Sequence, residues 1–328
     1  MKIINIKTTD PRINLASEYY YLTNNEYKND DLFLFWKNKN TIVIGKNQSF
    51  SSEVNQIYAK ENNVNIVRRM SGGGAVFHDD GNICFTFIRR NMKNSFQFKD
   101  SLIDIINFFK SENINAEFSG RNDIIVNNKK VSGNAVMFYK NDYLIHGTLL
   151  FNTNIEKMVN LLTVDKSKLI SKGIESVKSR VENIVNLTNK EQSEFENNFI
   201  SFFERKYNSK RIDVDLTKNK EVLDIIHDFF GNNNWTYGRD FDFNYKNRIR
   251  IKNGSLEVFI RTEKNIIKEI EINSDGLLTF DISDFKKLFI NQEYSISSIT
   301  NLIKGYDLNT VLEDLTPKDV VDLFFNNK

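Results

Sequence analysis

The sequence has one cysteine, two prolines and no long apolar run, and each of these features excludes a class of protein. Because Cys84 is the single cysteine among 328 residues, no internal disulfide framework is possible and a reducing compartment is expected. A membrane-spanning helix needs about 20 consecutive apolar residues, and the chain contains no such run. No signal-like segment opens the chain. We therefore expect a cytoplasmic protein with no membrane partner.

The chain also lacks an excess of either charge. Its 45 lysines and arginines nearly balance 43 aspartates and glutamates, which leaves a formal net charge of +2. Such a chain carries no overall field that would draw it to nucleic acid, so we expect no nucleic-acid partner and only local basic function. The sequence shows no cluster of residues with metal-ligand spacing, and we expect no dedicated metal site.

Apolar residues are what the chain has in quantity. They make up 40% of it, and 27 phenylalanines can fill a sizeable core. The length suits one large domain followed by a small one. The pattern changes to glycine and aromatic residues from Trp235 to Phe243, so we place a boundary near Asp240, between domains at 1–240 and 241–328. A monomer is the default expectation.

Helical and strand periodicities alternate along the chain, which indicates an α+β fold. One expected helix ends at Phe230, because Gly231 follows it as a natural stop. The other expected helices are residues 13–22, 54–61, 102–109, 155–162, 195–203 and one that starts at Pro317. The expected strands are 32–36, 41–44, 65–69, 83–89, 116–119, 123–126, 131–137 and 143–150, and then a meander of 248–251, 256–261 and 266–272 with an Asn253-Gly254 turn.

The stretch 68–82 is the strongest functional signal. It joins two apolar runs and holds Arg68, Arg69 and three successive glycines, Gly72 to Gly74. Such a run of glycines predicts positive φ or close approach of a ligand to the main chain. Glycine amides can form a concave nest for an anion, and the arginines add permanent charge and fork-shaped donors. The stretch matches neither a Walker loop nor the dinucleotide fingerprint, so the hypothesis is a different phosphate-binding loop.

Two other positions matter for chemistry. Residues 127–130 form a polar turn between two expected strands, so Lys130 should be held at the start of a strand. Lys129 beside it suits a solvated turn. His146 lies in the alternating segment 143–150, where a structural role and a place beside a pocket both stay open.

Five blocks of the chain share the order and spacing of motifs in one known family. They are residues 68–82, Ser-Gly-Arg-Asn-Asp at 119–123, Lys-Lys-Val-Ser-Gly-Asn-Ala at 129–135, His-Gly-Thr-Leu-Leu at 146–150, and 172–180. With these blocks the chain resembles the lipoate-protein ligases over nearly its whole length. The resemblance implies a biotin/lipoate ligase-type catalytic domain with mixed β-sheets and flanking helices, plus a small C-terminal α+β accessory domain.

The activity that the resemblance implies has two steps. Lipoate reacts with ATP, together with Mg²⁺, to give lipoyl-AMP and pyrophosphate, and the lipoyl group then passes to a specific lysine of an acceptor. The implied partners are the lipoyl-acceptor domains of 2-oxoacid dehydrogenase acyltransferase subunits or the glycine cleavage H protein. Attack of a carboxylate on the α-phosphate builds negative charge between two anions, which a fixed cation and backbone donors can stabilise.

The motif match also implies roles for single residues. Lys130 is the implied catalytic residue, because it is the fixed cation of the Lys-Val-Ser-Gly motif. Residues expected to contact ATP are Arg69, Gly74, Ala75, Val76, Phe77 and Lys130, with Asn82 and Asp123 as further adenylate or magnesium contacts. Residues expected to line the lipoate and phosphate site are Arg68, Ser71, Gly72 and Gly73, with His146 beside the lipoyl pocket.

Three alternatives compete with the ligase. An octanoyl or lipoyl transferase would use an acyl thioester and a nucleophilic cysteine, but Cys84 lies in an apolar run typical of a small buried residue. A noncatalytic lipoate-binding protein would need neither Arg69 nor Lys130. A biotin ligase would carry a different glycine motif.

Overall fold

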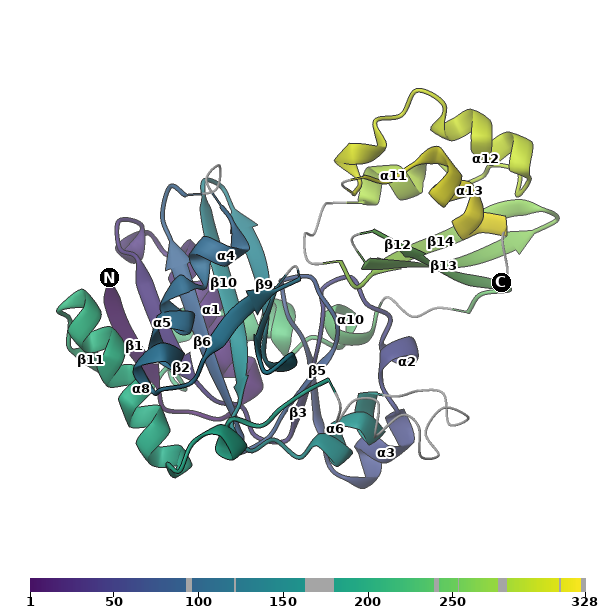
Figure 1. Cartoon of the computed structure of the whole chain (residues 1–328). Helices are drawn as coiled ribbons and strands as arrows, with labels where there is room; N and C mark the ends of the chain where they lie inside the picture. The colour runs from purple at the N-terminus through teal and green to yellow at the C-terminus, as the bar shows by residue number, and fades with distance from the viewer. Residues whose placement is uncertain are drawn as a thin grey trace.

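The computed structural model describes residues 1–92, 96–120, 122–162, 180–238, 242–252, 254–276, 282–312 and 314–325. Its largest element is a mixed sheet, in which β1 runs parallel to β2 and β11, whereas β6 and β10 run antiparallel to their neighbours (Figure 1). The strand order is β11 (Arg211–Val214), β1 (Lys2–Ile6), β2 (Leu32–Trp36), β6 (Asn82–Arg89), β10 (Asp142–Leu150), β9 (Lys129–Tyr139), β8 (Asp123–Val126) and β7 (Ala116–Ser119). The expected α+β class is confirmed.

A second, smaller sheet stands beside the large one. It consists of β4 (Asn65–Arg68), β3 (Thr41–Ile44) and β5 (Val76–His78), with β3 parallel to β4 and antiparallel to β5. The expected strands at 32–36 and 41–44 are therefore both present but belong to different sheets. The polar residues between them carry the chain from the large sheet to the small one. Residues 69–75, which connect β4 to β5, are called the glycine loop below.

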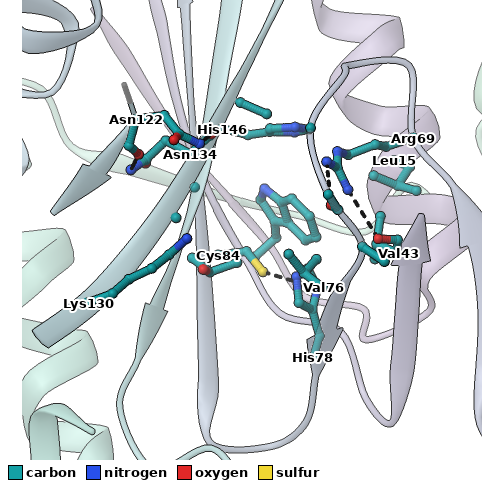
Figure 2. A pocket seen from close by; sticks show the side chains of 18 residues that line it. Leu15, Val43, Arg69, Val76, His78, Cys84, Asn122, Lys130, Asn134 and His146 are labelled. Atoms are coloured by element: carbon teal, nitrogen blue, oxygen red, sulfur yellow. Dashed lines mark hydrogen bonds between the residues drawn. The ribbon is translucent and has the colours of Figure 1, made fainter. Parts of the chain in front are cut away.

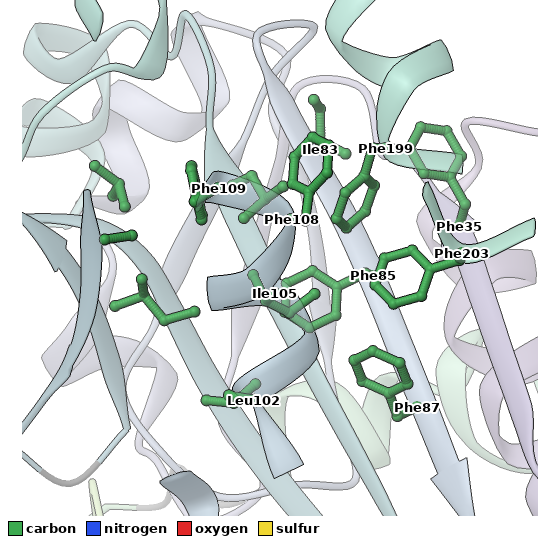
Figure 3. Packing of buried hydrophobic residues seen from close by; sticks show 14 of the residues in the cluster. Phe35, Ile83, Phe85, Phe87, Leu102, Ile105, Phe108, Phe109, Phe199 and Phe203 are labelled. Carbon is green, nitrogen blue, oxygen red and sulfur yellow. The ribbon is translucent and has the colours of Figure 1, made fainter. Parts of the chain in front are cut away.

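Helices cover both faces of the large sheet. On β2, Phe33 and Phe35 face a core under α5 (Ile103–Ser111) and α8 (Gln192–Tyr207), whereas Leu34 faces a second core under α1 (Pro11–Thr23) and α9 (Lys220–Ile225). Successive strand residues point to opposite faces, so the run Leu-Phe-Leu-Phe-Trp fills both cores. Each buried phenylalanine contributes roughly 1.5–3 kcal/mol. Figure 3 shows the first core, where Ile105, Phe108, Phe199 and Phe203 pack on Phe35, Phe85 and Phe87.

The other helices among the described residues up to 238 are short. They are α2 (Phe50–Glu53), α3 (Gln56–Glu61), α4 (Phe98–Ser101), α6 (Ile155–Leu162), α10 (Asn233–Tyr237), a π turn at Ile226–Phe230 that extends α9, and 3-10 turns at Asn25–Tyr27 and Ile184–Leu187. No helix among the described residues is long and apolar enough to cross a membrane.

One expected helix starts later than predicted, and two expectations fall on residues outside those that the structure describes. We expect a helix over residues 54–61, and the structure has α3 from Gln56 to Glu61. It starts two residues late because Val54 is extended and the Asn55 side chain accepts a hydrogen bond from the Tyr58 amide as the N-cap. Residues 172–179 of the fifth family block, and Asn253 of the expected turn, lie outside the described residues.

Described residues between 242 and 325 form what we call the C-terminal module (Figure 1). The expected meander is present as an antiparallel sheet, and its core is separate from the two cores of the large sheet. The last helix begins at Pro317, after a Thr316 that shares hydrogen bonds with Asp319, as a capped start requires. The elements are β12 (Tyr245–Ile251), β13 (Gly254–Glu263), β14 (Ile266–Ser274), α11 (Ser283–Lys287), α12 (Ile296–Ile303), α13 (Pro317–Phe325) and a 3-10 turn at Leu308–Thr310.

The C-terminal module touches the glycine loop directly. The Gly73 amide donates to the Gly276 carbonyl at 2.8 Å, and the Ser274 amide donates to the Asn47 carbonyl at 2.9 Å. Gly73 has a φ of 91°, in the region that favours glycine, so the expected positive φ occurs at one of the three glycines. In this arrangement the C-terminal module occupies a backbone donor that an anion could otherwise use.

Glu53 of α2 faces Arg248 of the C-terminal module and has a shifted pKa. The pKa of Glu53 is raised to about 7, mainly by burial and also by Glu257 and Asp275, while Arg248 and Lys246 oppose the shift. Arg248 lies 3.6 Å from the Glu53 carboxylate. The pKa of Glu53 in the folded protein lies above the ordinary value of 4.5, so between these two values the folded state binds a proton that the unfolded state does not. The stability that this proton contributes is complete below pH 4.5 and is lost as pH rises through about 7.

We expect Glu53→Gln to remove this pH dependence. Relative to the wild type, the variant should melt higher at pH 8 than at pH 5 by on the order of 2–4 °C, the shift that about 1 kcal/mol produces in a chain of this size. Thermal melts of both proteins at the two pH values test this. If the melting temperatures of the two proteins differ by the same amount at pH 5 and at pH 8, Glu53 has no part in the pH dependence.

Candidate active site

A cavity of about 150 Å³ lies between the large and the small sheet. Figure 2 shows Lys130 on one side of it and Arg69 with Val43 on the other. Its apolar walls suit an alkyl chain, and its few polar groups converge from separate elements, as in a small-molecule site. The lining residues are Leu15, Trp36, Val43, Arg69, Gly73, Gly74, Ala75, Val76, His78, Cys84, Asn122, Lys130, Gly133, Asn134, Ala135, His146, Gly147 and Thr148.

The register of the large sheet explains why these side chains meet. His146 of β10 lies opposite Thr86 of β6 and Ala135 of β9, and Cys84 lies opposite Thr148 and Trp36. Residues two apart on a strand share a face. The sheet therefore presents small and polar residues to the cavity and its phenylalanines to the opposite core.

Arg69 holds the glycine loop together. Its guanidinium donates to the Gly72 carbonyl at 2.6 Å, to Gly74 at 2.8 Å and to Val43 at 3.1 Å, and its Nε–H donates to the Ser71 hydroxyl at 3.0 Å. Burial lowers the pKa of Arg69 to about 10, so it remains charged at neutral pH. Most hydrogen-bond donors of Arg69 are thus used to hold the glycine loop, of which Arg69 is itself the first residue.

Lys130 lies inside β9, and the expectation that it is held on a strand is confirmed. Its amide donates to the Arg180 carbonyl at 2.8 Å, and its carbonyl accepts from the Glu182 amide at 2.9 Å. The side-chain ammonium lies 2.7 Å from Asp123, and 36% of the side chain is exposed. Lys129 next to it pairs with Glu182 at 2.9 Å, facing away from the lining of the cavity.

His78 is a buried neutral imidazole in the cavity wall. Asn38 donates to its Nδ1 at 3.1 Å, so Nδ1 is an acceptor and the proton is on Nε2. Burial, with Arg69 and His146 adding to it, lowers the pKa of His78 to about 3. His78 therefore stays uncharged at physiological pH.

Cys84 is unsuited to nucleophilic catalysis. The thiol is fully buried, and burial raises its pKa well above the ordinary value. A thiolate is the reactive form of cysteine, and this environment disfavours it. The structure thus gives the transferase alternative no activated nucleophile among the described residues.

The structure brings together most, but not all, of the predicted site residues. Those that line the cavity are Arg69, Gly73, Gly74, Ala75, Val76, Lys130 and His146. Ser71 and Gly72 lie one layer behind, bonded to Arg69, and Asp123 pairs with Lys130. Phe77 packs in the core of the small sheet, and Asn82 is buried with its amide 3.3 Å from the Cys84 sulfur.

Arg68 is placed differently from the prediction, which put it in the wall of the lipoate and phosphate site. Its side chain is fully buried and does not line the cavity. The guanidinium donates to the carbonyls of Gly45, Gln48 and Thr236 at 2.9, 2.6 and 2.8 Å. These bonds connect β4 to the loop after β3 and to α10. Its position is that of a structural residue, because its donors point at the backbone and not at the cavity.

Three residues at or behind the cavity were not predicted from the sequence: Asn122, Asn134 and Glu18. The two asparagines exchange hydrogen bonds with each other's carbonyls at 2.5 and 2.8 Å on the side of Lys130. Both fall inside the quoted motifs, which was the available signal. Glu18 lies on the core-facing side of α1 between Leu15 and Leu22, and an acidic residue at that helical spacing is a signal of a buried polar function.

Comparisons with known proteins agree with the cavity and the fold. A family model described as the lipoyl protein ligase A/B catalytic domain matches residues 10–204, and one described as the bacterial lipoate protein ligase C-terminus matches residues 240–324. The probable lipoate-protein ligase A of Mycoplasma pneumoniae is 34% identical, over 97% of this chain and 96% of that protein. Lipoate-protein ligase LplJ of Bacillus subtilis is 35% identical, over 98% of this chain and 99% of its own length. The crystal structure of P. falciparum LipL1 in complex with lipoate has a TM-score of 0.77 and 29% identity, and the match covers 98% of this chain and 97% of that one.

Fold and cavity together indicate a ligase of the biotin/lipoate type, with an apolar-walled cavity between two sheets. The chain belongs to the lipoate-protein ligase family, whose members attach lipoate to proteins. The resemblance seen in the sequence blocks is thereby confirmed.

Proposed function

We propose that this protein activates lipoate with ATP and then transfers the lipoyl group to a lysine of an acceptor domain. The observation that carries the proposal is the cavity itself, whose apolar walls lead to Lys130 on one side and to the glycine loop on the other. The structure of LipL1 in complex with lipoate supports lipoate as the acid.

In the first step a carboxylate oxygen of lipoate attacks the α-phosphorus of ATP. The new oxygen–phosphorus bond forms as the bond to the bridging oxygen breaks and pyrophosphate leaves. Negative charge grows on the phosphoryl oxygens, and the Lys130 ammonium stabilises it in the transition state. Asp123, 2.7 Å from that ammonium, orients it before the substrates arrive.

The remaining assignments follow the same division of the cavity. Phe77 would act through its main chain, since its side chain is only 2% exposed in the core of the small sheet. The nucleotide contacts are Arg69, Gly74, Ala75, Val76, Phe77, Asn82, Asp123 and Lys130. Gly73 and His146 complete the wall of the lipoate and phosphate site, and Ser71 and Gly72 support that wall from behind through their hydrogen bonds to Arg69. Arg68 is left out because its donors are bound to backbone.

The Mg²⁺ that accompanies ATP fits this site as an ion held mainly by phosphates. Among the described residues no group of three or more acidic, histidine or cysteine side chains is placed to hold a metal. Asp123 offers one carboxylate beside the cavity, and Mg²⁺ is often bound by one or two carboxylates plus substrate phosphates. An ion held there would neutralise phosphate charge.

In the second step the amine of an acceptor lysine attacks the carbonyl carbon of lipoyl-AMP. The amide bond forms as the bond to the phosphate oxygen breaks and AMP leaves. We propose the lipoyl domains of 2-oxoacid dehydrogenase acyltransferase subunits, or the glycine cleavage H protein, as acceptors. The separate core of the C-terminal module supports a division into a catalytic domain at 1–240 and an accessory domain at 241–328.

The test combines pyrophosphate release with the mass of the acceptor. Purified protein is incubated with ATP, Mg²⁺, free lipoate and a panel of lipoyl domains. We expect pyrophosphate and a lipoyl mass increment that both require ATP. An increment obtained from an acyl thioester without ATP would favour the transferase, and binding of lipoate with neither product would favour the noncatalytic protein.

A further inference from the structure

A buried carboxylate stands behind the cavity, and the proposed chemistry does not use it. Glu18 of α1 is only 4% exposed. Both of its oxygens lie 3.0 Å from Nδ1 of His146, and the Thr86 hydroxyl lies 2.5 Å from Oε1. Burying a carboxyl group is costly unless hydrogen bonds compensate for the lost water, and these bonds supply that compensation.

The first chain of hydrogen bonds runs from Glu18 to the glycine loop. Nε2 of His146 lies 2.7 Å from the Ser71 hydroxyl, which accepts the Nε–H of Arg69 at 3.0 Å. A carboxylate can only accept, so the Nδ1–H of His146 points to Glu18, and Nε2 of the neutral imidazole is left to accept the hydrogen of the Ser71 hydroxyl. We call His146, Ser71 and Arg69 the loop branch.

The second chain runs from Glu18 to the floor of the cavity. The indole N–H of Trp36 donates to the Thr86 oxygen at 2.9 Å, and the Thr86 hydroxyl donates to Glu18. An indole is also only a donor, so this chain has one direction as well. Thr86 and Trp36 are called the indole branch. The two branches converge because β6 and β10 place Thr86 opposite His146.

We propose that Glu18 is the positioning residue of both cavity walls, holding the glycine loop through the loop branch and the Trp36 indole through the indole branch. Its carboxylate is the terminal acceptor of both branches, because His146 and Thr86 each donate to it. The inference rests on the proposed function, in which the glycine loop meets ATP and the apolar wall meets lipoate. Glu18 itself does not line the main cavity, so it acts through its neighbours.

The loop branch predicts an effect on ATP. In Glu18→Gln one of the two oxygens that face the Nδ1–H of His146 becomes an amide nitrogen, which cannot accept it, and the remaining oxygen must serve both His146 and Thr86. The loop branch is therefore weakened at its acceptor, and Ser71→Ala interrupts it one bond further on. Each variant should raise the KM for ATP about 10-fold, the effect of losing about 1.4 kcal/mol, and change the KM for lipoate by less than about 3-fold. Because both changes break one chain, the double variant should add no more than about 2-fold.

The indole branch predicts the opposite split. Thr86→Val keeps the shape of the side chain but removes the hydroxyl that holds the Trp36 indole. The KM for lipoate should rise about 10-fold and the KM for ATP by less than about 3-fold. Combined with Glu18→Gln, the two effects should multiply, since they act in separate branches.

The experiment measures pyrophosphate release at varied ATP and varied lipoate for the wild type, Glu18→Gln, Ser71→Ala, the Glu18→Gln/Ser71→Ala double variant and Thr86→Val. Ser17→Ala is the matched control, because Ser17 is buried beside Glu18 on α1 and, within the described part of the chain, its hydroxyl bonds only the Ile13 carbonyl of its own helix, at 2.7 Å. It should lower the melting temperature without moving either KM.

Two results would overturn the inference: variants that lose stability with both KM values unchanged, or a Ser17→Ala variant that shifts KM as much as the others. If Glu18→Gln does not fold, Ser71→Ala and Thr86→Val decide, since each removes only one hydroxyl. A wild type that releases no pyrophosphate would instead reject the proposed function, and this inference with it.

Discussion

Lys130→Ala should reduce the rate of pyrophosphate release by about 10²–10³-fold, the usual effect of removing one fixed stabiliser of transition-state charge. The change should leave the fold intact, because the side chain is 36% exposed and its partner Asp123 is 35% exposed and can be solvated. The measurement is single-turnover pyrophosphate release with saturating lipoate and ATP, together with a thermal melt. Lys129→Ala is the matched control, since Lys129 is adjacent and paired with Glu182. It should change the rate by less than about 2-fold.

A second variant separates the position of the amine from its presence. A Cβ added at Gly133 would lie 2.8 Å from both Cε and Nζ of Lys130, so Gly133→Ala must push the amine aside while the flexible side chain accommodates the methyl group. We expect a loss of about 10–100-fold, as for a misplaced catalytic group. Normal release by a folded Lys130→Ala variant would remove Lys130 from the mechanism.

The position of Lys130 could be predicted because it depends on local structure. Asn127 and Asn128 both adopt positive φ, which asparagine tolerates well, so the tight turn and the start of β9 follow from neighbouring residues. The strands around Phe33 and Phe85 were equally predictable, since alternating faces require nothing from distant segments. The fold class and the location of the site both rest on such local patterns.

The division of labour between Arg68 and Arg69 could not be predicted. The two arginines are adjacent, and their types are identical, but one side chain is committed to carbonyls 167 and 168 residues away while the other stays at the cavity. Only the packing of α10 against β4 distinguishes them. Glu18 was missed for the same reason, since its partners lie on β6 and β10, far along the chain.

Arg68→Met should destabilise the protein severely and leave its chemistry intact. The guanidinium makes bonds to carbonyls of Gly45, Gln48 and Thr236 with no exposure to water. Methionine fills much of the volume but donates nothing, and each buried acceptor left without a partner costs about 1–3 kcal/mol. A loss of at least about 3 kcal/mol should lower the melting temperature by ~10 °C in a chain of this size.

Kinetic measurements on Arg68→Met distinguish a structural role of Arg68 from a role in substrate binding. Well below the melting temperature of the variant, kcat/KM for lipoate and for ATP should stay within about 3-fold of the wild type, because Arg68 does not line the cavity. Arg205→Met, at an exposed position of α8, is the matched control and should change neither property. An Arg68→Met protein with an unchanged melting temperature and a raised KM for lipoate would return Arg68 to the substrate wall, because lost binding and not lost backbone bonding would then explain its effect.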